Sequence, residues 1–366
     1  MKLLAREIPI DYLLVLRGCA ALGVFSGHLA ALGPISIGAV VTKGQWNYTP
    51  HAEPFETWRS VLEILTPLLG LNFVVLFFVQ SGFLMGKVFF DRRYDAENGK
   101  FEFYWARYLR LAPLLYVNLV VCAFFYKYAD VAPLKLAADF LFLNNFTGPS
   151  VNGVTWSLSH EMQYYLVAPF VFMFCKRHIG WLLAAIAAAF VIGQFAPPFG
   201  YTYAFLVGFG VNLMPKRIVT ARAKHVGLIV GLLVLHLGFN SLMFAHFETA
   251  AVLLATIASA ALVYVCEQQS NAPSSMLLRW GVLTGYLTFG FYLWHYVVIR
   301  TFTDTILGWT SALTDTPWAA TMIFHGLELV TALPVSYGLA WLSFVFIESR
   351  FRPGLYAGVH PSRASS

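Results

Sequence analysis

An arginine and a histidine share one face of an otherwise apolar segment near the start of the chain. Arg17 and His28 stand in DYLLVLRGCAALGVFSGHLAAL with ten residues between them. Eleven helical steps of about 100° bring both side chains to nearly the same face, roughly 16 Å apart along the axis. A cation inside a membrane-spanning helix is costly and is retained mainly where it has a function. The pair therefore predicts a site, or a path between two sites, inside a bundle of helices.

Two further arginines share a helix face in FYWARYLRLAPLLY. Arg107 and Arg110 are one turn apart, and two guanidinium groups at this spacing can hold phosphate oxygens bidentately. The preceding segment adds Arg92, Arg93 and Lys100. One interpretation is a phosphorylated donor molecule bound at the cytoplasmic mouth of this helix. The alternative is that the pair only anchors the helix by extending toward lipid headgroups.

A third polar group lies in TWSLSHEMQYYLVAPF. Ser157 and Glu161 are four residues apart on one face, with Tyr164 and Tyr165 about one turn further on. On an apolar helix this pattern indicates a hydrogen-bonded polar seam, although a carboxylate near a helix N-terminus can also simply stabilise that end. Glu161 and His28 both fall in the external half of the predicted topology. We expect the carboxylate to hold one ring nitrogen of His28, leaving the other to take a proton from a hydroxyl group.

Other polar side chains favour packing roles. His160 points about 100° away from the polar seam on its helix. In FFVQSGFLMG, Ser81 and Gly82 predict close approach of a neighbouring helix in preference to a nucleophilic serine. In GFYLWHYVVI, Tyr292 precedes His295 by one turn, so we expect a polar contact there in the bundle interior.

The elements that position these residues are predicted to be membrane-spanning helices. The chain has 366 residues, of which 58% are hydrophobic and 11% are charged, whereas soluble proteins carry about 25% charged residues. The apolar windows of spanning length cover residues 11–32, 61–88, 103–126, 155–175, 179–196, 199–214, 226–245, 248–266, 281–301 and 319–347. Basic residues gather in alternate loops, as on the cytoplasmic side of multi-pass proteins. We predict an all-α polytopic integral membrane protein with about ten transmembrane helices and both termini in the cytoplasm.

Residues 127–154 are the exception to this pattern. Their apolar part is too short to cross the membrane and is followed by Asn, Gly and Pro, which predicts a re-entrant or interfacial segment after the third helix. We interpret residues 1–352 as a single transmembrane domain that begins with a retained signal-anchor helix. Residues 353–366 are expected to form a short polar tail.

Cysteine usage and charge restrict the function further. The four cysteines are scattered through apolar segments without paired spacing, which is typical of small buried hydrophobic residues. No helix-borne metal motif such as HExxH is present, so no metal is expected. The net charge of +6 reflects the basic loops of a membrane protein and does not indicate binding of nucleic acid. The oligomeric state, a homo-oligomer included, stays open.

Taken together, the motifs resemble the membrane-bound acyltransferase 3 family, which acylates sugars and other hydroxyl acceptors in bacteria. The resemblance extends along nearly the whole chain, through LRGCAALGVFSGHL, FFVQSGFLMG, FYWARYLRLAPLLY, TWSLSHEMQYYLVAPF, GFYLWHYVVI and FVFIESRFR. It implies that Arg17 and His28 are essential. It also implies that Arg107 and Arg110 contact an acyl-CoA donor.

The resemblance extends to a serine–glutamate motif and has three departures. Ser157, Ser159 and Glu161 match the family's WSLSxE pattern. His160 stands where the family usually has a small apolar residue, and Gln80 stands where it often has leucine. The closing segment FVFIESRFR lacks the usual E-x-P ending. The first two differences affect the choice of acceptor substrate in our interpretation, and the third affects only the end of the last helix.

The resulting hypothesis is an O-acyltransferase of the bacterial inner membrane. It would transfer an acyl group from cytoplasmic acyl-CoA, with acetyl-CoA the expected donor, to a hydroxyl group of a cell-surface or exported glycan or a lipid-linked saccharide. His28 is the expected general base, oriented by Glu161, with Arg17 stabilising negative charge. The donor-binding residues are expected to be Arg92, Arg93, Arg107 and Arg110. The residues expected to contact substrate are Ser157, Ser159, Tyr164 and Tyr165.

Two other classes of protein stay open at this point. A transporter could use the same intramembrane Arg, His and Glu side chains as a relay, but it predicts inverted repeats, which the sequence does not show. A structural subunit of a polysaccharide export complex could use them only to hold helices together. Within the enzyme hypothesis, direct transfer and a covalent relay through a serine, a histidine or Cys19 are both open.

Overall fold

The protein is a bundle of α-helices in a computed structural model. The structure describes residues 11–32, 39–42, 45–48, 70–97, 99–125, 132–148, 151–176, 178–216, 220–244, 247–268, 275–314 and 317–351. The predicted C-terminal tail and the first ten residues lie outside the described residues. The longer helices are α1 (Tyr12–Leu32), α3 (Leu71–Phe90), α4 (Lys100–Phe125), α7 (Trp156–Cys175), α8 (Ile179–Phe195), α12 (Glu248–Glu267), α13 (Met276–Leu313) and α14 (Pro317–Ser343). The shorter elements are β1 (Ala39–Thr42), β2 (Gln45–Tyr48), α5 (Pro133–Phe140), α6 (Asn144–Thr147), η2 (Pro197–Phe199), α9 (Thr202–Val211), α10 (Ala221–Leu233), η3 (Val234–Gly238), α11 (Phe239–Phe244), η4 (Phe344–Glu348) and α15 (Ser349–Phe351).

In the described residues, a helical segment lies within each of the ten predicted windows. Seven helical stretches in the described part of the chain are long and apolar enough to cross a membrane, and α8 is a shorter apolar helix of 17 residues. The helix α7 has 20 residues but is not among the seven, because its first half carries the polar side chains of the predicted seam. The helix α9 has only 10 residues. The all-α polytopic class is confirmed, with about seven spans and shorter apolar helices.

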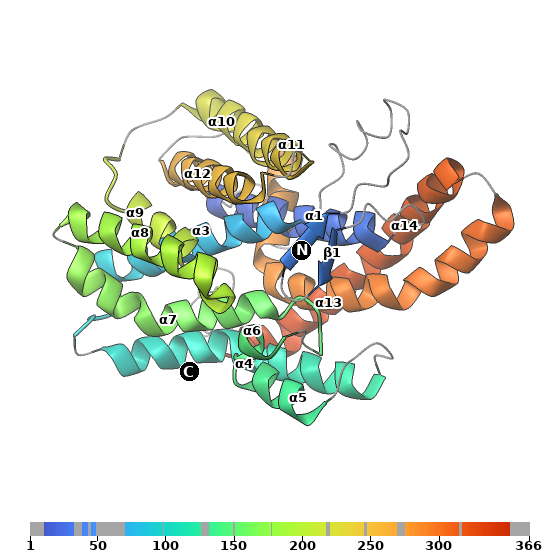
Figure 1. Cartoon of the computed structure of the whole chain (residues 1–366), viewed down its shortest axis with the longest axis horizontal. Coiled ribbons are helices and arrows are strands. Elements are labelled where there is room, and N and C mark those ends of the chain that lie inside the picture. Colours follow the sequence, from blue (N-terminus) through green and yellow to red (C-terminus); the bar gives the residue numbers. More distant parts are fainter. Residues whose placement is uncertain are drawn as a thin grey trace, which may run out of the picture.

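The helices α1 and α3 lie in the middle of the bundle (Figure 1). In that view α10 and α12 cover one side, α4 and α7 lie on the opposite side, and α13 and α14 extend together to the right. The helix α1 packs along α13, whereas α3 packs against α7, α9 and α12. The outer faces carry large exposed apolar side chains such as Phe124, Phe195 and Val330. Exposed apolar surface on this scale fits a lipid environment.

Glycines allow two of these helix pairs to approach closely. A Cβ atom on Gly18 would lie 2.5 Å from the carbonyl oxygen of Gly281, so α1 and α13 touch almost backbone to backbone. In the same way, a Cβ atom on Gly82 would lie 1.9 Å from the carbonyl oxygen of Phe205 on α9. Small residues at helix contacts are typical of membrane bundles. The predicted close approach at Gly82 is confirmed.

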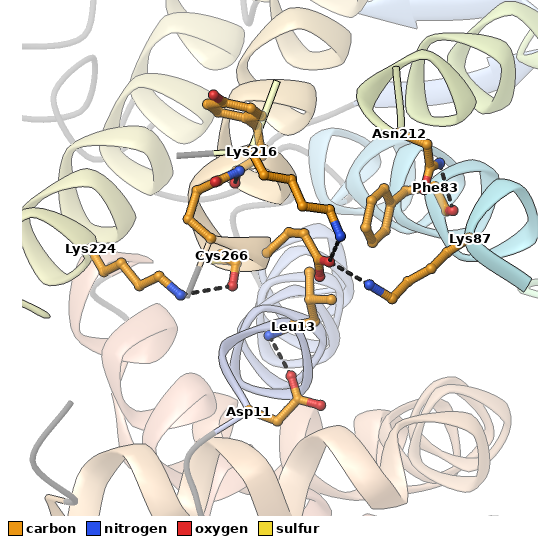
Figure 2. Close-up of polar contacts among 11 residues, drawn as sticks. Asp11, Leu13, Phe83, Lys87, Asn212, Lys216, Lys224 and Cys266 are labelled. Atoms are coloured by element: carbon orange, nitrogen blue, oxygen red, sulfur yellow. Dashed lines mark hydrogen bonds and ion pairs between the residues drawn. The ribbon is translucent and has the colours of Figure 1, made fainter. Parts of the chain in front are cut away.

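Polar contacts gather at the end of the bundle where α1 begins (Figure 2). Asp11 caps α1 by accepting a 2.9 Å hydrogen bond from the backbone nitrogen of Leu13. Lys87 forms an ion pair with Glu267, and Lys216 lies 3.9 Å from the same carboxylate. These residues come from the ends of α3 and α12 and from the segment after α9. The basic segment after α9 therefore lies at the end of the bundle where α1 begins.

Residues 132–148 form short helices in place of a spanning one. The eight-residue α5 begins at Pro133 and is followed by the single turn α6. The helix α5 lies beside α4, and α6 packs against α5 and α7 (Figure 1). A left-handed residue, Phe142 with φ of 58°, ends α5 and turns the chain into α6. The predicted short segment after the third spanning helix is confirmed.

Candidate functional site

A cavity lies where five helices meet in the middle of the bundle. Its polar lining comes from α1, α3, α4, α7 and α13, and its apolar lining includes Phe77, Phe78 and Phe289. The empty space, its open mouth included, is about 470 Å³. The polar side chains that line it are Arg17, Ser81, Arg110, Ser157, Glu161, Thr288 and Tyr292. Four of these are predicted site residues from separate parts of the sequence, which the fold brings together.

Glu161 is the carboxylate of the cavity. Its Oε1 accepts a hydrogen bond of 3.0 Å from the hydroxyl group of Ser81 on α3 and another from the hydroxyl group of Tyr165, one turn later on α7. Arg17 and Arg110 line the same cavity. Two guanidinium groups and one carboxylate give the lining an excess of positive charge. In a setting poor in water, such a lining attracts an anionic or polarised group.

Ser157 faces α13. Its hydroxyl group lies 2.7 Å from that of Tyr292, and the carbonyl oxygen of Val154 lies 3.2 and 3.1 Å from the two, so one hydroxyl group can donate to the other and the second to this carbonyl oxygen. Because Val154 immediately precedes α7, this contact ties the start of that helix to α13. Tyr292 therefore lines the cavity with a hydroxyl group held in a fixed direction.

The structure pairs His28 with His295 in place of Glu161, the partner that the sequence analysis assigned to it. The Nδ1 atom of His28 lies 3.0 Å from the Nε2 atom of His295 on α13. Glu161 shares its cavity with Arg17, whereas His28 lies about 16 Å further along α1. His28 and Glu161 therefore lie at different depths of the bundle, which is why they do not pair. Helix periodicity predicts which face of a helix a residue occupies, but it does not predict which residue of a neighbouring helix lies at the same depth.

The cavity and the histidine pair are linked through Tyr292. The ring centroids of Tyr292 and His295 are 5.6 Å apart, and those of His295 and His28 are 5.0 Å apart. Tyr292 also lines the cavity. A chain of ring contacts therefore leads from Tyr292 in the cavity lining, through His295, to His28. The polar contact expected at Tyr292 and His295 is confirmed.

Backbone contacts define which ring nitrogen of His28 carries hydrogen. Its Nδ1 atom lies 3.1 Å from the carbonyl oxygen of Val24, and a carbonyl oxygen can only accept. This contact favours the tautomer of the neutral ring in which Nδ1 carries the hydrogen. The Nε2 atom then keeps its lone pair, which is the form of histidine that can take a proton from a hydroxyl group.

A buried polar network holds the start of α7 in place. Asp139 on α5 is 1% exposed and accepts from the amide of Asn144, the backbone nitrogen of Val151 and the hydroxyl group of Thr155, at 2.5, 2.8 and 3.0 Å. Burial raises the pKa of Asp139, while these three hydrogen bonds act to lower it. Ser159 on α7 donates to Asn144 at 2.7 Å and so belongs to this network. The short helices after α4 thus position the helix that carries Glu161.

The remaining predicted residues lie outside the cavity lining. Arg107 packs over the Phe103 ring, with its Nε atom buried and without a hydrogen-bond partner. Arg92 and Arg93 are exposed in the segment between α3 and α4. Tyr164 is buried and stacks on Phe205, with ring centroids 4.6 Å apart. This face of α7 packs on α9 and is not part of the cavity.

Four contributors to the site were not predicted for it. Ser81 was assigned to packing, although it also donates to Glu161 inside the cavity. His295 and Tyr292 were expected only to make a polar contact. The signal that could have identified them is the same as for Arg17, namely polar side chains in the middle of long apolar helices. Thr288, one turn before Tyr292, also lines the cavity.

The described part of the chain contains no group of three or more His, Cys, Asp or Glu side chains arranged to hold a metal ion. All four cysteines are free, and Cys122, Cys175 and Cys266 are buried. Their predicted role as small buried residues is confirmed for these three.

Comparison with known proteins gives one match. The family model of acyltransferase 3, described as an acyltransferase domain, matches residues 10–344. No curated protein and no solved structure matches the chain. The chain therefore belongs to the acyltransferase 3 family. It is a multi-pass membrane enzyme that transfers an acyl group from a donor to an acceptor.

Proposed function

We propose that the protein is an O-acetyltransferase of the bacterial inner membrane. It takes the acetyl group from cytoplasmic acetyl-CoA and transfers it to a hydroxyl group of an exported or cell-surface glycan or a lipid-linked saccharide. The observation that carries the proposal is that Arg110 and Arg17 line one cavity with Tyr292, which contacts His295, the hydrogen-bond partner of the half-buried His28. This arrangement provides cations for a phosphorylated donor at one level and a base at another.

Dimensions support the placement of the donor. Arg17 and His28 are separated by about 16 Å along α1, and the extended pantetheine arm of CoA is roughly 16–20 Å long by chain reach. Arg107 and Arg110 on α4 hold phosphate groups of CoA in this proposal, with Arg92 and Arg93 near the mouth. The thioester then lies beyond Tyr292, close to His28.

The chemistry is direct acyl transfer. The hydroxyl group of the acceptor substrate gives its proton to Nε2 of His28 as its oxygen bonds to the thioester carbon. Negative charge develops on the carbonyl oxygen beside His28, while Arg17, about 16 Å away along α1, holds the donor in the cavity. The carbon–sulfur bond then breaks, and the CoA thiolate takes the proton back from His28. The products are the acetyl ester and free CoA, and no metal or covalent intermediate is required.

The test is release of free CoA by purified protein in detergent. We expect release from acetyl-CoA only when a hydroxyl-bearing glycan is present, and we expect His28→Ala to reduce it at least 100-fold. His178→Ala is the matched control, because His178 is exposed outside the bundle interior. A transporter or a structural subunit would release no CoA with any acyl-CoA. Unchanged turnover in His28→Ala would reject the proposed base.

A further inference from the structure

His295 sits in the middle of α13 with none of its surface exposed. Its Nε2 atom is 3.0 Å from Nδ1 of His28, across the contact of α1 and α13 that Gly18 and Gly281 make close. We propose that His295 is a positioning residue for acyl transfer. It supplies the hydrogen-bond acceptor that orients the ring of His28 and stabilises the cation that His28 becomes. This inference rests on the proposed function, because it requires His28 to be the base.

The direction of the hydrogen bond follows from the backbone. The Nδ1 atom of His295 lies 3.2 Å from the carbonyl oxygen of Phe291, which can only accept, so this nitrogen carries hydrogen. In the neutral ring, Nε2 of His295 then has a free lone pair. In the tautomer that the Val24 contact favours, the single Nδ1–H of His28 is shared between that lone pair and the carbonyl oxygen of Val24. The unprotonated Nε2 of His28 is left for the acceptor substrate.

The ring of His295 is held by its neighbours. It stacks on Phe291 with an angle of 9° between the rings, and Phe25 and Tyr292 also lie against it. With both nitrogens hydrogen bonded, rotation of the ring would break two contacts in a buried setting. The acceptor atom is therefore presented to His28 in one direction, as expected of a group that orients a catalytic base.

The surroundings explain why a neutral acceptor suits this position. The aromatic rings that lie against the two histidines are those of Phe25, Phe291, Tyr292 and Tyr296. An unpaired carboxylate would be costly to bury in such a place. A neutral imidazole imposes no charge before the reaction. When His28 takes the proton, its Nδ1–H becomes a charge-assisted donor, and the bond to His295 becomes stronger.

The proton balance requires no change in His295. His28 gains a proton at Nε2 from the hydroxyl group of the acceptor substrate and returns it to the CoA thiolate. The bond from Nδ1 of His28 to His295 persists through both steps. His295 thus takes the part that the aspartate plays in a serine hydrolase triad, with a lone pair in place of a charge.

Three substitutions at this position separate a positioning role from a packing role. The side chain of glutamine can place an oxygen where Nε2 of His295 lies, whereas asparagine is too short, and leucine has no acceptor at all. In the acetyl-CoA assay we expect His295→Gln to keep kcat within about fivefold of the wild type. We expect His295→Asn and His295→Leu to lower kcat at least 30-fold, with KM for acetyl-CoA changed less than threefold. His325→Gln, half-buried on α14 and outside the site, serves as the matched control.

The outcomes distinguish this inference from the proposed function. Each variant is first checked for a single gel-filtration peak and an unchanged unfolding temperature in detergent. If His28→Ala is inactive and folded His295→Asn or His295→Leu equals the wild type, the inference is wrong and the proposed function stands. A folded His295→Gln as inactive as His295→Leu would also overturn it, even if the other two variants fail to fold. If His28→Ala retains turnover, the proposed function itself fails.

Discussion

The hydroxyl group of Ser81 on α3 donates a 3.0 Å hydrogen bond to the carboxylate of Glu161 on α7. This contact lies inside the cavity that Arg17 and Arg110 also line. It holds the carboxylate in one direction within this cavity. A role for Ser81 in orientation follows directly from this geometry.

Glu161→Gln should reduce turnover far more than Ser81→Ala. The first change removes the charge that balances the arginines, and we expect a loss of about 100-fold or more in kcat/KM. The second removes one hydrogen bond of about 1 kcal/mol, which corresponds to roughly a fivefold loss. The rates are compared in the CoA-release assay at matched protein purity. Equal losses would contradict the assignment of Glu161 as the main electrostatic group.

Replacing the arginine pair should affect the donor substrate specifically. Arg110 lines the cavity and Arg107 does not, so Arg110→Ala should raise KM for acetyl-CoA about tenfold, and more than Arg107→Ala does. The double variant should raise the donor requirement more than the acceptor requirement. Titration of each substrate at saturating levels of the other measures this. Equal changes for both substrates would indicate that the pair only anchors the helix.

The contact of α3 and α9 should not tolerate even one added methyl group. A Cβ atom on Gly82 would lie 1.9 Å from a backbone carbonyl oxygen, so Gly82→Ala must push the helices apart. We expect it to cost about 1–3 kcal/mol and to lower the unfolding temperature in detergent. Gly338→Ala on α14, where a Cβ atom would meet nothing within 4 Å, is the matched control. An unfolding temperature equal to that of the control would contradict the packing at Gly82.

The orientation of the bundle can be tested with two exposed positions. Glu97 lies between α3 and α4, and Glu248 begins α12. A single cysteine is placed at either position in a variant that lacks the natural cysteines. We expect a membrane-impermeant maleimide to label position 97 only in inverted vesicles. It should label position 248 only in right-side-out vesicles. The reverse pattern would place the arginine pair outside the cell and separate it from cytoplasmic acetyl-CoA.

The sequence predicted the helices well because the membrane imposes a strong pattern. Apolar windows and basic loops locate helices and their ends, and each predicted window contains a helix. The short α5 and α6 were also predictable, since residues 127–154 have too little apolar length to cross. The sequence predicted less well which of these helices are long and apolar enough to span the membrane. The polar half of α7 takes that helix outside the hydropathy expected of a spanning segment.

Residue type was enough to predict several of the side chains that line the cavity, but it did not predict which of them pair with one another. Arg17, Arg110, Ser157 and Glu161 were each selected for being polar on an apolar helix, and all four line one cavity. The partner of His28 was not predictable, because it depends on which depth of α13 faces α1. The packing of Gly18 against Gly281 sets that register, and no local pattern in either helix reveals it.

The most direct test of the account compares acetyl-CoA binding and turnover in one variant, His28→Gln. If the arginine-lined cavity binds the donor and His28 acts only on the acceptor substrate, purified His28→Gln should bind acetyl-CoA within about threefold of the wild-type Kd. Its turnover should fall at least 100-fold. Turnover close to that of the wild type, or loss of donor binding together with activity in a folded protein, would contradict the account.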